Sequence, residues 1–389
     1  MHDVMAGYVA RDAAPGIVTL VSRRGKTFVD AVGTTTTGGS KPIRRDTIFR
    51  ITSLTKPIVA AATMILVEEC KVRLNEPVDR LLPELANRKV LKRLNGPLDD
   101  TVPAERPLTV RDLLTFRLGF GLVFESPDTY PILKALIELE IGLGVPAPAT
   151  PPAPDEWIRR LGTLPLMYQP GEKWLYDTGS DVLGVLIARA SGQPLETFLR
   201  ERLFEPLGMN DTSFSVPAEK LDRFTPQYII NYMTGEREQY DATEGGQWSA
   251  PPTFPSGANG LVSTIDDYLA FGQMMLNKGE HGNTRILSRP SVELMTTDQL
   301  TPAQKAVSGM EPGYFDSHGW GFGVAITTRR DELSAIGRFG WDGGFGSTWY
   351  ADPKEELVGI MMTQMALTSG SPPEHFLDFW TLAYAAIED

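Results

Sequence analysis

FRITSLTKPIVAAATMILVEE, residues 49–69, joins a Ser-x-x-Lys motif, Ser53 to Lys56, to a long apolar stripe rich in helix-forming residues. This composition predicts a helix from Leu54 to Lys71. Serine and lysine three positions apart share one face of a helix, so the amine can reach the hydroxyl. At a helix start, the backbone N–H of the serine and the positive end of the helix dipole can stabilise an oxyanion. The motif therefore makes Ser53 a candidate nucleophile.

The same motif can also be explained by a structural role without catalysis. Taken alone, Ser53 is more simply explained as a helix N-cap that is followed by a solvated lysine. Pro57 disfavours helical geometry at Lys56, but proline is tolerated in a first turn, where N–H groups have no helical partner. The surroundings of the motif must therefore decide between the two readings.

The segments on either side of the motif differ in their secondary-structure signals. Residues 16–22 and 27–32 are rich in β-formers and are separated by RRGK, which predicts a hairpin. Helical patterns dominate from the motif to about residue 207, interrupted at residues 145–155 by the proline-rich VPAPATPPAPD, which predicts a surface loop. The expected helices include TVRDLLTF at Thr109, PILKALIELEIG at Pro131, SDVLGVLIARASG at Ser180 and LETFLRERLF at Leu195.

Beyond about residue 220 the pattern favours strands again. WGFGVAITT from Trp320, GSTWYAD from Gly346 and ELVGIMMTQM from Glu356 predict strands, and residues 373–389 predict a closing amphipathic helix. Strands at both ends around a helical middle predict an α+β protein. We expect a discontinuous sheet domain, residues 1–72 and 222–389, with a helical domain, residues 73–221, inserted into it.

Composition and charge exclude several classes of protein. Of the 389 residues, 42% are apolar and 22% are charged, which is typical of a packed globule. The net charge of −12 would repel phosphate backbones and anionic lipids, so we expect no nucleic-acid or membrane partner. The longest apolar run, residues 58–67, is too short to span a bilayer, and the acidic N-terminal stretch lacks a secretion signal. We therefore expect a cytoplasmic protein, with its one cysteine, Cys70, buried in the core.

Two further stretches could carry chemistry. Tyr176 follows the turn QPGEK and precedes a helix, so it could act as a general base if a cation such as Lys56 lowered its pKa from about 10. A half-buried structural aromatic is the alternative. The run Gly340 to Gly346, GWDGGFG, allows close backbone approach to a ligand, and one of its N–H groups could stabilise an oxyanion. A bulge or tight turn explains that run equally well.

Other chemistries lack their motifs. None of the four histidines lies in a zinc-ligand spacing, and no H-E-x-x-H is present. The G-x-S-x-G elbow and the phosphate-binding glycine loops are absent too. We therefore expect neither a metal nor a cofactor.

Taken together and in order, the Ser-x-x-Lys helix start, the tyrosine motif and the glycine-containing strand motif resemble serine β-lactamases and penicillin-binding proteins. The resemblance is closest to the class C branch, and within it to the family VIII carboxylesterases. TVRDLLTFRLGFG from Thr109, FEPLGMNDTSF from Phe204 and GANGLVSTIDDYLAF from Gly257 add to it, so that it covers nearly the whole chain. The resemblance implies an antiparallel sheet flanked by helices, with an all-helical domain inserted.

The resemblance also implies roles for individual residues. Ser53 would form the acyl-enzyme, Lys56 and Tyr176 would handle protons, and the backbone N–H groups of Ser53 and Gly344 would form the oxyanion hole. The sequence departs from the lactamases at two positions. Asp177 and Thr178 follow Tyr176 where lactamases have Tyr-x-Asn, and Trp341-Asp342-Gly343 replaces Lys-Thr-Gly, as in the esterase branch. Asp177, Trp341, Asp342 and Gly343 are thus expected at the substrate pocket.

These residues favour a cofactor-free serine hydrolase, most simply a carboxylesterase that cleaves small-molecule esters with short acyl groups through an acyl-enzyme. A β-lactamase or a D-alanyl-D-alanine carboxypeptidase is the alternative inside the enzyme class. A non-catalytic binding protein on the same fold is the more remote one.

Overall fold

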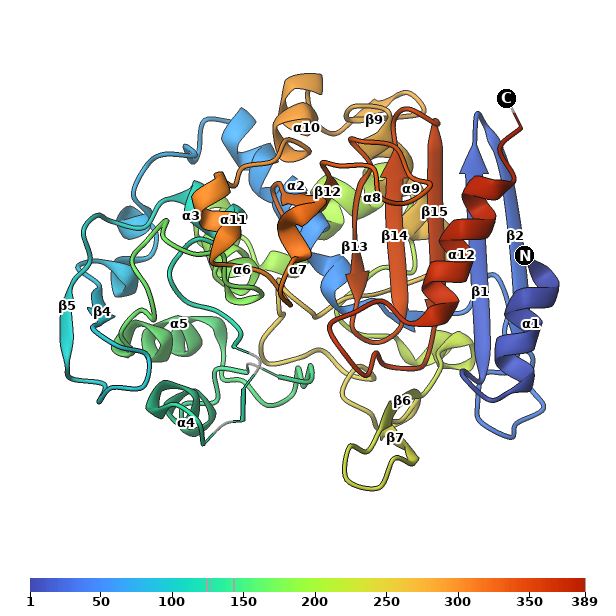
Figure 1. The fold of residues 1–389 in the computed structure, drawn as a ribbon, viewed down its shortest axis with the longest axis horizontal. Helices are drawn as coiled ribbons and strands as arrows, with labels where there is room; N and C mark the ends of the chain where they lie inside the picture. The colour runs from blue at the N-terminus through green and yellow to red at the C-terminus, as the bar shows by residue number, and fades with distance from the viewer. Residues whose placement is uncertain (124, 127, 143, 389) are drawn as a thin grey trace.

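The computed structural model describes residues 1–123, 125–126, 128–142 and 144–388, and it combines a large sheet with a mostly helical region (Figure 1). The sheet has seven antiparallel strands in the order β11-β12-β13-β14-β15-β1-β2. Its strands are β1 (Gly16–Arg23), β2 (Lys26–Gly33), β11 (His318–Trp320), β12 (Ala325–Thr327), β13 (Phe339–Gly343), β14 (Ser347–Asp352) and β15 (Leu357–Thr363). The α+β fold class with an antiparallel sheet is confirmed.

Strand β1, near the N-terminus, pairs with the last strand of the sheet along the chain. It pairs with β2, which confirms the predicted hairpin, and on its other side with β15, where Ile17 lies opposite Thr363. Every residue of β15 is buried, which is typical of a strand covered on both faces. The N-terminal hairpin therefore completes a sheet built mainly from the C-terminal part of the chain.

Helices cover both faces of this sheet. Helices α1 (His2–Ala10) and α12 (Glu374–Ala385) lie on one face, and α9 (Ile265–Leu276) packs against β14 and β15 on the other (Figure 1). The closing helix was expected from residue 373 and begins at Glu374. Trp380 of α12 approaches Gly359 so closely that an added Cβ would lie 2.5 Å from its ring. Glycine at this position therefore lets α12 lie close to the sheet.

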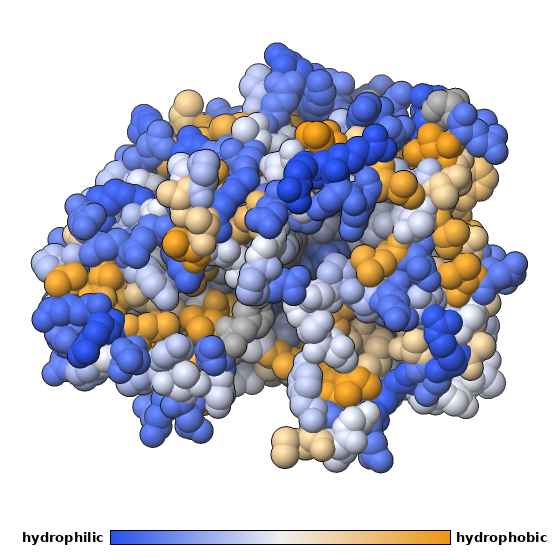
Figure 2. Space-filling view, in the orientation of Figure 1, coloured by the Kyte–Doolittle hydropathy of each residue, from blue (hydrophilic) through white to orange (hydrophobic). Residues whose placement is uncertain are grey.

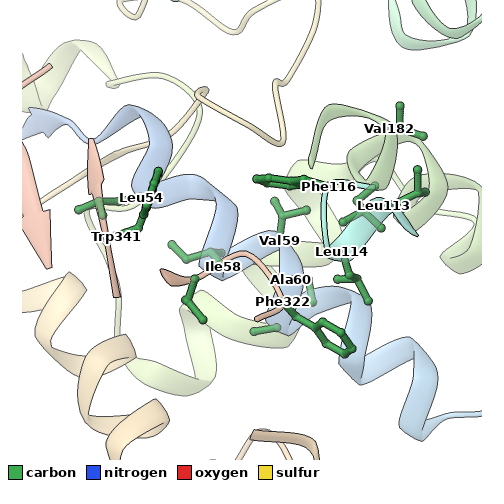
Figure 3. Packing of buried hydrophobic residues seen from close by; sticks show 14 of the residues in the cluster. Leu54, Ile58, Val59, Ala60, Leu113, Leu114, Phe116, Val182, Phe322 and Trp341 are labelled. Atoms are coloured by element: carbon green, nitrogen blue, oxygen red, sulfur yellow. The ribbon is translucent and has the colours of Figure 1, made fainter. Parts of the chain in front are cut away.

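Helix α2 (Thr55–Glu68) lies between the sheet and the helical region. All residues from Thr55 to Leu66 are buried, so the helix has no solvent-facing side over that length. It packs against α6 (Thr178–Ser191), and its apolar side chains meet residues from several other segments (Figure 3). The stretch that carries the Ser-x-x-Lys motif is therefore the centre of the core.

The helical region holds most of the remaining helices, and it also contains a small two-stranded sheet that the sequence patterns do not predict. The division into residues 1–72 with 222–389 and residues 73–221 stays a prediction. The other α-helices of the described residues are α3 (Val110–Leu114), α4 (Pro131–Glu138), α5 (Pro154–Thr163), α7 (Leu195–Leu199), α8 (Glu205–Leu207), α10 (Arg289–Met295) and α11 (Pro302–Ala306), and the π-helical turn η4 (Arg200–Phe204) joins α7 to α8. Strands β3 (Phe49–Arg50) and β8 (Val262–Ser263), β4 (Lys89–Leu91) and β5 (Thr101–Pro103), β6 (Gln227–Ile230) and β7 (Arg237–Asp241), and β9 (Glu280–His281) and β10 (Thr284–Arg285) form four separate pairs.

Two expectations are wrong. Cys70 is exposed, because α2 ends at Glu68 and the chain turns out of the core with a φ of 58° at Cys70. The stretch from Trp320 forms two short strands, β11 and β12, instead of one. Gly321 donates its N–H to the carbonyl of Val324 at 2.8 Å, and Gly323 has a φ of 71°, so the glycines allow a tight turn there. Among the described residues, no helix is both long and apolar enough to cross a bilayer.

Candidate active site

Ser53 and Lys56 lie together where a short 3-10 turn, η1 (Thr52–Leu54), leads into α2. The Lys56 Nζ donates a hydrogen bond to the Ser53 Oγ at 2.9 Å. The residue before the serine, Thr52, has a φ of 42°, a conformation that is rare for a threonine. The lysine is fully buried, so the reading of Ser53 as a plain N-cap followed by a solvated lysine does not describe this structure.

The Lys56 ammonium lies in a cage of oxygen atoms. Besides Ser53, it contacts the Asp177 Oδ1 at 2.6 Å, the Ala258 carbonyl at 3.0 Å and the Asn259 Oδ1 at 3.2 Å. Burial by itself lowers the pKa of this amine, but the charges of Asp177 and Tyr176 outweigh burial, and the pKa is raised. Lys56 is therefore held in its charged form.

Tyr176 lies beside the same ammonium. Its ring centroid is 4.5 Å from the Lys56 Nζ, and its hydroxyl accepts a hydrogen bond from the Trp341 Nε1 at 2.5 Å. The pKa of the phenol is raised by burial, although Lys56, the Ser53 hydroxyl and the Trp341 N–H each act to lower it. Lys56 thus acts on this pKa in the direction that the general-base hypothesis requires, but the burial of the ring, which the sequence does not reveal, outweighs its effect.

Asp177 has a strained backbone next to Tyr176. Its φ of 86° and ψ of −71° are those of a classic γ-turn, and the N–H of Thr178 donates to the Tyr176 carbonyl at 3.3 Å. The Asp177 carboxylate contacts Lys56 and accepts a hydrogen bond from the Asn259 Nδ2 at 2.9 Å. The strained backbone conformation of Asp177 therefore directs its carboxylate at Lys56. Backbone strain of this kind is common at functional sites.

Asn259 is a site residue that the sequence patterns did not single out. Its Oδ1 accepts a hydrogen bond from the Ser53 Oγ at 2.9 Å, which makes it a direct neighbour of the candidate nucleophile. The only signal was the stretch from Gly257, which contributed to the family resemblance without a role for any residue. Sequence spacing could not reveal this contact, because more than two hundred residues separate the two side chains.

Asp181 holds the loop that carries Asn259. Its Oδ1 accepts hydrogen bonds from the Ser256 Oγ at 2.6 Å and from the Ala258 N–H at 3.0 Å. The Ala258 carbonyl in turn contacts Lys56. Burial and the neighbouring charge of Asp177 raise the pKa of Asp181 to about 7. Asp181 thus fixes the loop whose Ala258 carbonyl contacts the Lys56 ammonium.

The strand motif lies against the serine turn. A Cβ added at Gly343 would lie 2.4 Å from the Ile51 carbonyl, so only glycine allows β13 to approach this closely. Gly344 follows at the hairpin turn, and a Cβ added there would meet no atom within 4 Å. Trp341 is 5% exposed and packs edge-on against Trp320, with 4.7 Å between the ring centroids. The role of Gly344 in an oxyanion hole stays a prediction.

A cavity of about 2210 Å³ opens beside these residues, in the hollow visible near the centre of the face in Figure 2. Small-molecule sites commonly measure about 300–1,000 Å³. Five predicted site residues line the cavity: Ser53, Tyr176, Trp341, Asp342 and Gly344. Lys56, Asp177 and Gly343 are close to Ser53 but are not among the lining residues. Apolar side chains from the helical region and from α12 form much of the remaining wall, including Leu133, Leu136, Ile137, Phe376 and Trp380.

The sequence model of the Beta-lactamase family matches residues 1–378. The chain belongs to the beta-lactamase family. Among its relatives in this family, Esterase EstB of Burkholderia gladioli is 30% identical over 92% of this chain and 88% of its own. Protein Rv1367c of Mycobacterium tuberculosis (strain ATCC 25618 / H37Rv) is 37% identical over 90% of this chain and 85% of its own.

A solved structure shares the fold of this chain. EstCE1, described as a hydrolase with promiscuous acyltransferase activity, superimposes with a TM-score of 0.80 at 23% identity, over 98% of this chain and 97% of its own. The chain thus has the serine beta-lactamase-like fold related to the family VIII esterases, with esterase and acyltransferase homologues. In the part of the chain that the structure describes, no group of three or more His, Cys, Asp or Glu side chains is placed to hold a metal ion.

Proposed function

We propose that this protein is a carboxylesterase that cleaves esters of short acyl groups through an acyl-enzyme on Ser53. One observation carries the proposal: the Lys56 Nζ lies 2.9 Å from the Ser53 Oγ, and this serine lines a large cavity together with Tyr176. A buried lysine beside a serine, with a second titratable group nearby, is the arrangement that activates a hydroxyl for attack.

Tyr176 is the group that takes the serine proton in this mechanism. Lys56 stays positively charged. Burial raises the pKa of Tyr176 above its usual value, so the phenol is the resting form, but the charge of Lys56 and the Trp341 N–H reduce the free-energy cost of forming the reactive phenolate. The phenolate removes the proton of Ser53 as the Oγ attacks the ester carbonyl carbon, and it returns this proton to the departing alkoxide. In the second half, water attacks the acyl carbon and gives a proton to Tyr176, which passes this proton to the Ser53 Oγ as the bond between the Oγ and the acyl carbon breaks, so that the acid leaves and the serine is restored.

The strand motif favours esters over β-lactams. A lactam antibiotic carries a carboxylate, which a lysine in the strand motif would attract, whereas this chain has Trp341 and Asp342 there. Burial raises the pKa of Asp342 to about 6, so at pH 8 it is largely anionic and repels such a carboxylate. EstB, a relative named as an esterase, supports the same choice.

The cavity supports a small acyl group joined to a large alcohol. We assign the acyl group to the wall formed by Trp341, whose indole favours compact apolar groups, and the alcohol to the remaining volume. The same volume could admit a second alcohol in place of water. Acyl transfer to an alcohol is therefore the second candidate function, and the described activity of EstCE1 supports it.

Two measurements test the proposal. A fluorophosphonate should label the peptide that contains Ser53 and should fail to label Ser53→Ala. Ser126→Ala, which changes an exposed serine that also lines the cavity, should still be labelled. The kcat/KM for p-nitrophenyl butyrate should exceed those for nitrocefin and for a D-Ala-D-Ala peptide by at least about 100-fold, equivalent to two factors of 1.4 kcal/mol. Labelling of another serine would refute the assigned nucleophile, and equal turnover of nitrocefin would favour a β-lactamase.

A further inference from the structure

Asp177 is the N-cap residue of α6, but its side chain does not cap that helix. An aspartate at this position usually accepts a hydrogen bond from a backbone N–H of the first turn. The Asp177 side chain makes no such bond with the first turn of α6, which the structure describes in full, and only 5% of the residue is exposed. Its Oδ1 lies 2.6 Å from the Lys56 Nζ instead. Capping therefore does not explain a buried aspartate at this position.

The Lys56 ammonium can donate three hydrogen bonds, and four oxygen atoms surround it. Three of them, on Asp177, Ala258 and Asn259, can only accept a hydrogen bond. The fourth, the Ser53 Oγ, can also donate. A neutral amine has two N–H groups and a lone pair, and three of these four oxygens would repel that lone pair. The surrounding oxygens therefore favour the ammonium form, and among the four groups Asp177 carries the counter-charge.

The charge of Lys56 depends on this carboxylate because the lysine has no contact with water. The side chain is fully buried, and burial is the largest influence on its pKa, which it lowers. The charge of Asp177 is the next largest influence, and together with Tyr176 it raises the pKa above the usual value. Tyr176 adds a charge only as a phenolate, and its own pKa is raised. In the resting enzyme the proton on Lys56 therefore depends chiefly on Asp177.

The other groups that face Lys56 do not replace Asp177. Asp181, a further titratable group in the first turn of α6, directs its Oδ1 at the Ala258 N–H at 3.0 Å. The loop at residues 256–260 brings no titratable side chain. From this loop, the Asn259 Nδ2 donates a hydrogen bond to the Asp177 Oδ1 at 2.9 Å and holds the carboxylate in place. The strained φ of 86° and this hydrogen bond thus both serve the contact between Asp177 and Lys56.

We infer that Asp177 is a positioning residue that fixes Lys56 as a cation, so that Tyr176 and not Lys56 removes the proton of Ser53. This inference rests on the proposed esterase function. With Asp177 in place, the amine has no lone pair, and its charge reduces the cost of forming the Tyr176 phenolate. Without the carboxylate, the neutral amine of Lys56, 2.9 Å from the Ser53 Oγ, would take the serine proton, become an ammonium group and return the proton to the departing alkoxide.

The first test replaces Asp177 by asparagine. The amide oxygen can still face Lys56 and accept from the Asn259 Nδ2, so the variant removes the charge and keeps the shape. We measure kcat/KM for p-nitrophenyl butyrate from about pH 6 to about pH 9. In the wild type kcat/KM should rise throughout, because the population of the Tyr176 phenolate rises. In Asp177→Asn it should level off within this range, where Lys56 has lost its proton.

Two control variants accompany this pH profile. Asp177→Glu keeps the carboxylate and should keep the shape of the wild-type profile. Asp99→Asn makes the same change at an exposed position and should also keep this shape. A profile of Asp177→Asn with the wild-type shape would overturn the inference.

The second test removes the Tyr176 hydroxyl in two backgrounds. Tyr176→Phe should lower kcat/KM at least about 100-fold in the wild type, but less than about tenfold in Asp177→Asn, because Lys56 is then the base. If Asp177 only supported the fold, its replacement would lower activity without changing the loss caused by Tyr176→Phe. An equal loss in both backgrounds would therefore refute the inference.

The outcomes separate this inference from the proposed function. If the wild type neither hydrolyses p-nitrophenyl butyrate nor reacts with a fluorophosphonate at Ser53, the proposed function itself is overturned. Should Asp177→Asn not fold, nuclear magnetic resonance of the wild type decides. With carbon-13 at the lysine Cε, the Lys56 signal, assigned by its loss in Lys56→Arg, should remain that of an ammonium group over the same pH range. A change to the signal of a neutral amine would refute the inference.

Discussion

Replacing Asp181 by asparagine should make the protein more stable at pH 8 and leave it little changed at pH 4. Asparagine keeps an oxygen for the Ser256 hydroxyl and the Ala258 N–H, so the loop that carries Asn259 stays in place. The variant removes only the ionisation of a buried carboxyl group. The effect therefore depends on pH in a way that the pKa of Asp181 determines.

The sign and the size of this change in the free energy of unfolding follow from the pKa of Asp181. Burial, together with the charge of Asp177, raises the pKa of Asp181 from 3.8 to about 7 in the folded protein. Below pH 3.8 both folded and unfolded chains hold the proton, and no stability is lost. Between pH 4 and 7 only the folded chain holds it, so the free energy of unfolding falls by about 1.4 kcal/mol per pH unit, or roughly 4 kcal/mol in total. The Asp181→Asn variant escapes this loss, because its amide does not ionise.

Thermal unfolding of both proteins from pH 4 to 8 measures this difference. Unfolding entropy of about 2.1 cal/mol/K per residue gives roughly 0.8 kcal/mol/K for a chain of this length, so the variant should gain about 5 °C over the wild type across the range. Asp99→Asn, at an exposed position, should show no such gain. If the melting temperatures of wild type and Asp181→Asn depend on pH in the same way, the reasoning is refuted. A pH-dependent gain in melting temperature for Asp177→Asn alone would mean that Asp177, and not Asp181, holds the proton.

Three further outcomes are expected. Lys56→Ala and Tyr176→Phe should each remove most of the activity, and the double variant should lose little more, because the two side chains act as one unit. Losses of the two single variants that add in log kcat in the double variant would contradict this. Asp241→Asn should lower the free energy of unfolding by about 3–5 kcal/mol in denaturant titrations, since it leaves the fully buried Arg50 without its ion-pair partner; a loss below about 1 kcal/mol would mean that the guanidinium is solvated. Gly343→Ala should abolish labelling by a fluorophosphonate even where the variant stays folded by circular dichroism, because the added methyl group pushes β13 from the serine turn; normal labelling would show that the strand can shift at no cost.

The sequence predicts well those features that depend on local pattern. The hairpin at residues 16–32 and the central helix could be recognised because the spacing of apolar residues and the turn residues indicate the same structure over short stretches. The proximity of Ser53 and Lys56 followed from helix geometry alone. Tyr176 could be placed near them only through the order of motifs in the family, and its catalytic role stays a prediction.

Features that depend on tertiary packing were harder to predict. Asn259 reaches Ser53 from a loop distant in sequence, and the loop adopts its position because Asp181 holds it. The raised pKa of Tyr176 comes from the burial of its ring, which no local pattern reports. Cys70 was misplaced because α2 ends at Glu68, three residues before the predicted end at Lys71, and such an error at a helix end moves a side chain from the core to the surface.

The pairing of β1 with β15 has a consequence for how the protein is made. A ribosome adds about 5–20 residues per second, so the chain between Arg23 and Leu357 takes roughly 17–70 s to synthesise. During that time the N-terminal hairpin has left the ribosome, and one edge of β1 has no strand to pair with. Such an edge can pair with other chains. A nascent polypeptide of this protein should therefore depend on chaperones that shield its first thirty residues until the last strand emerges.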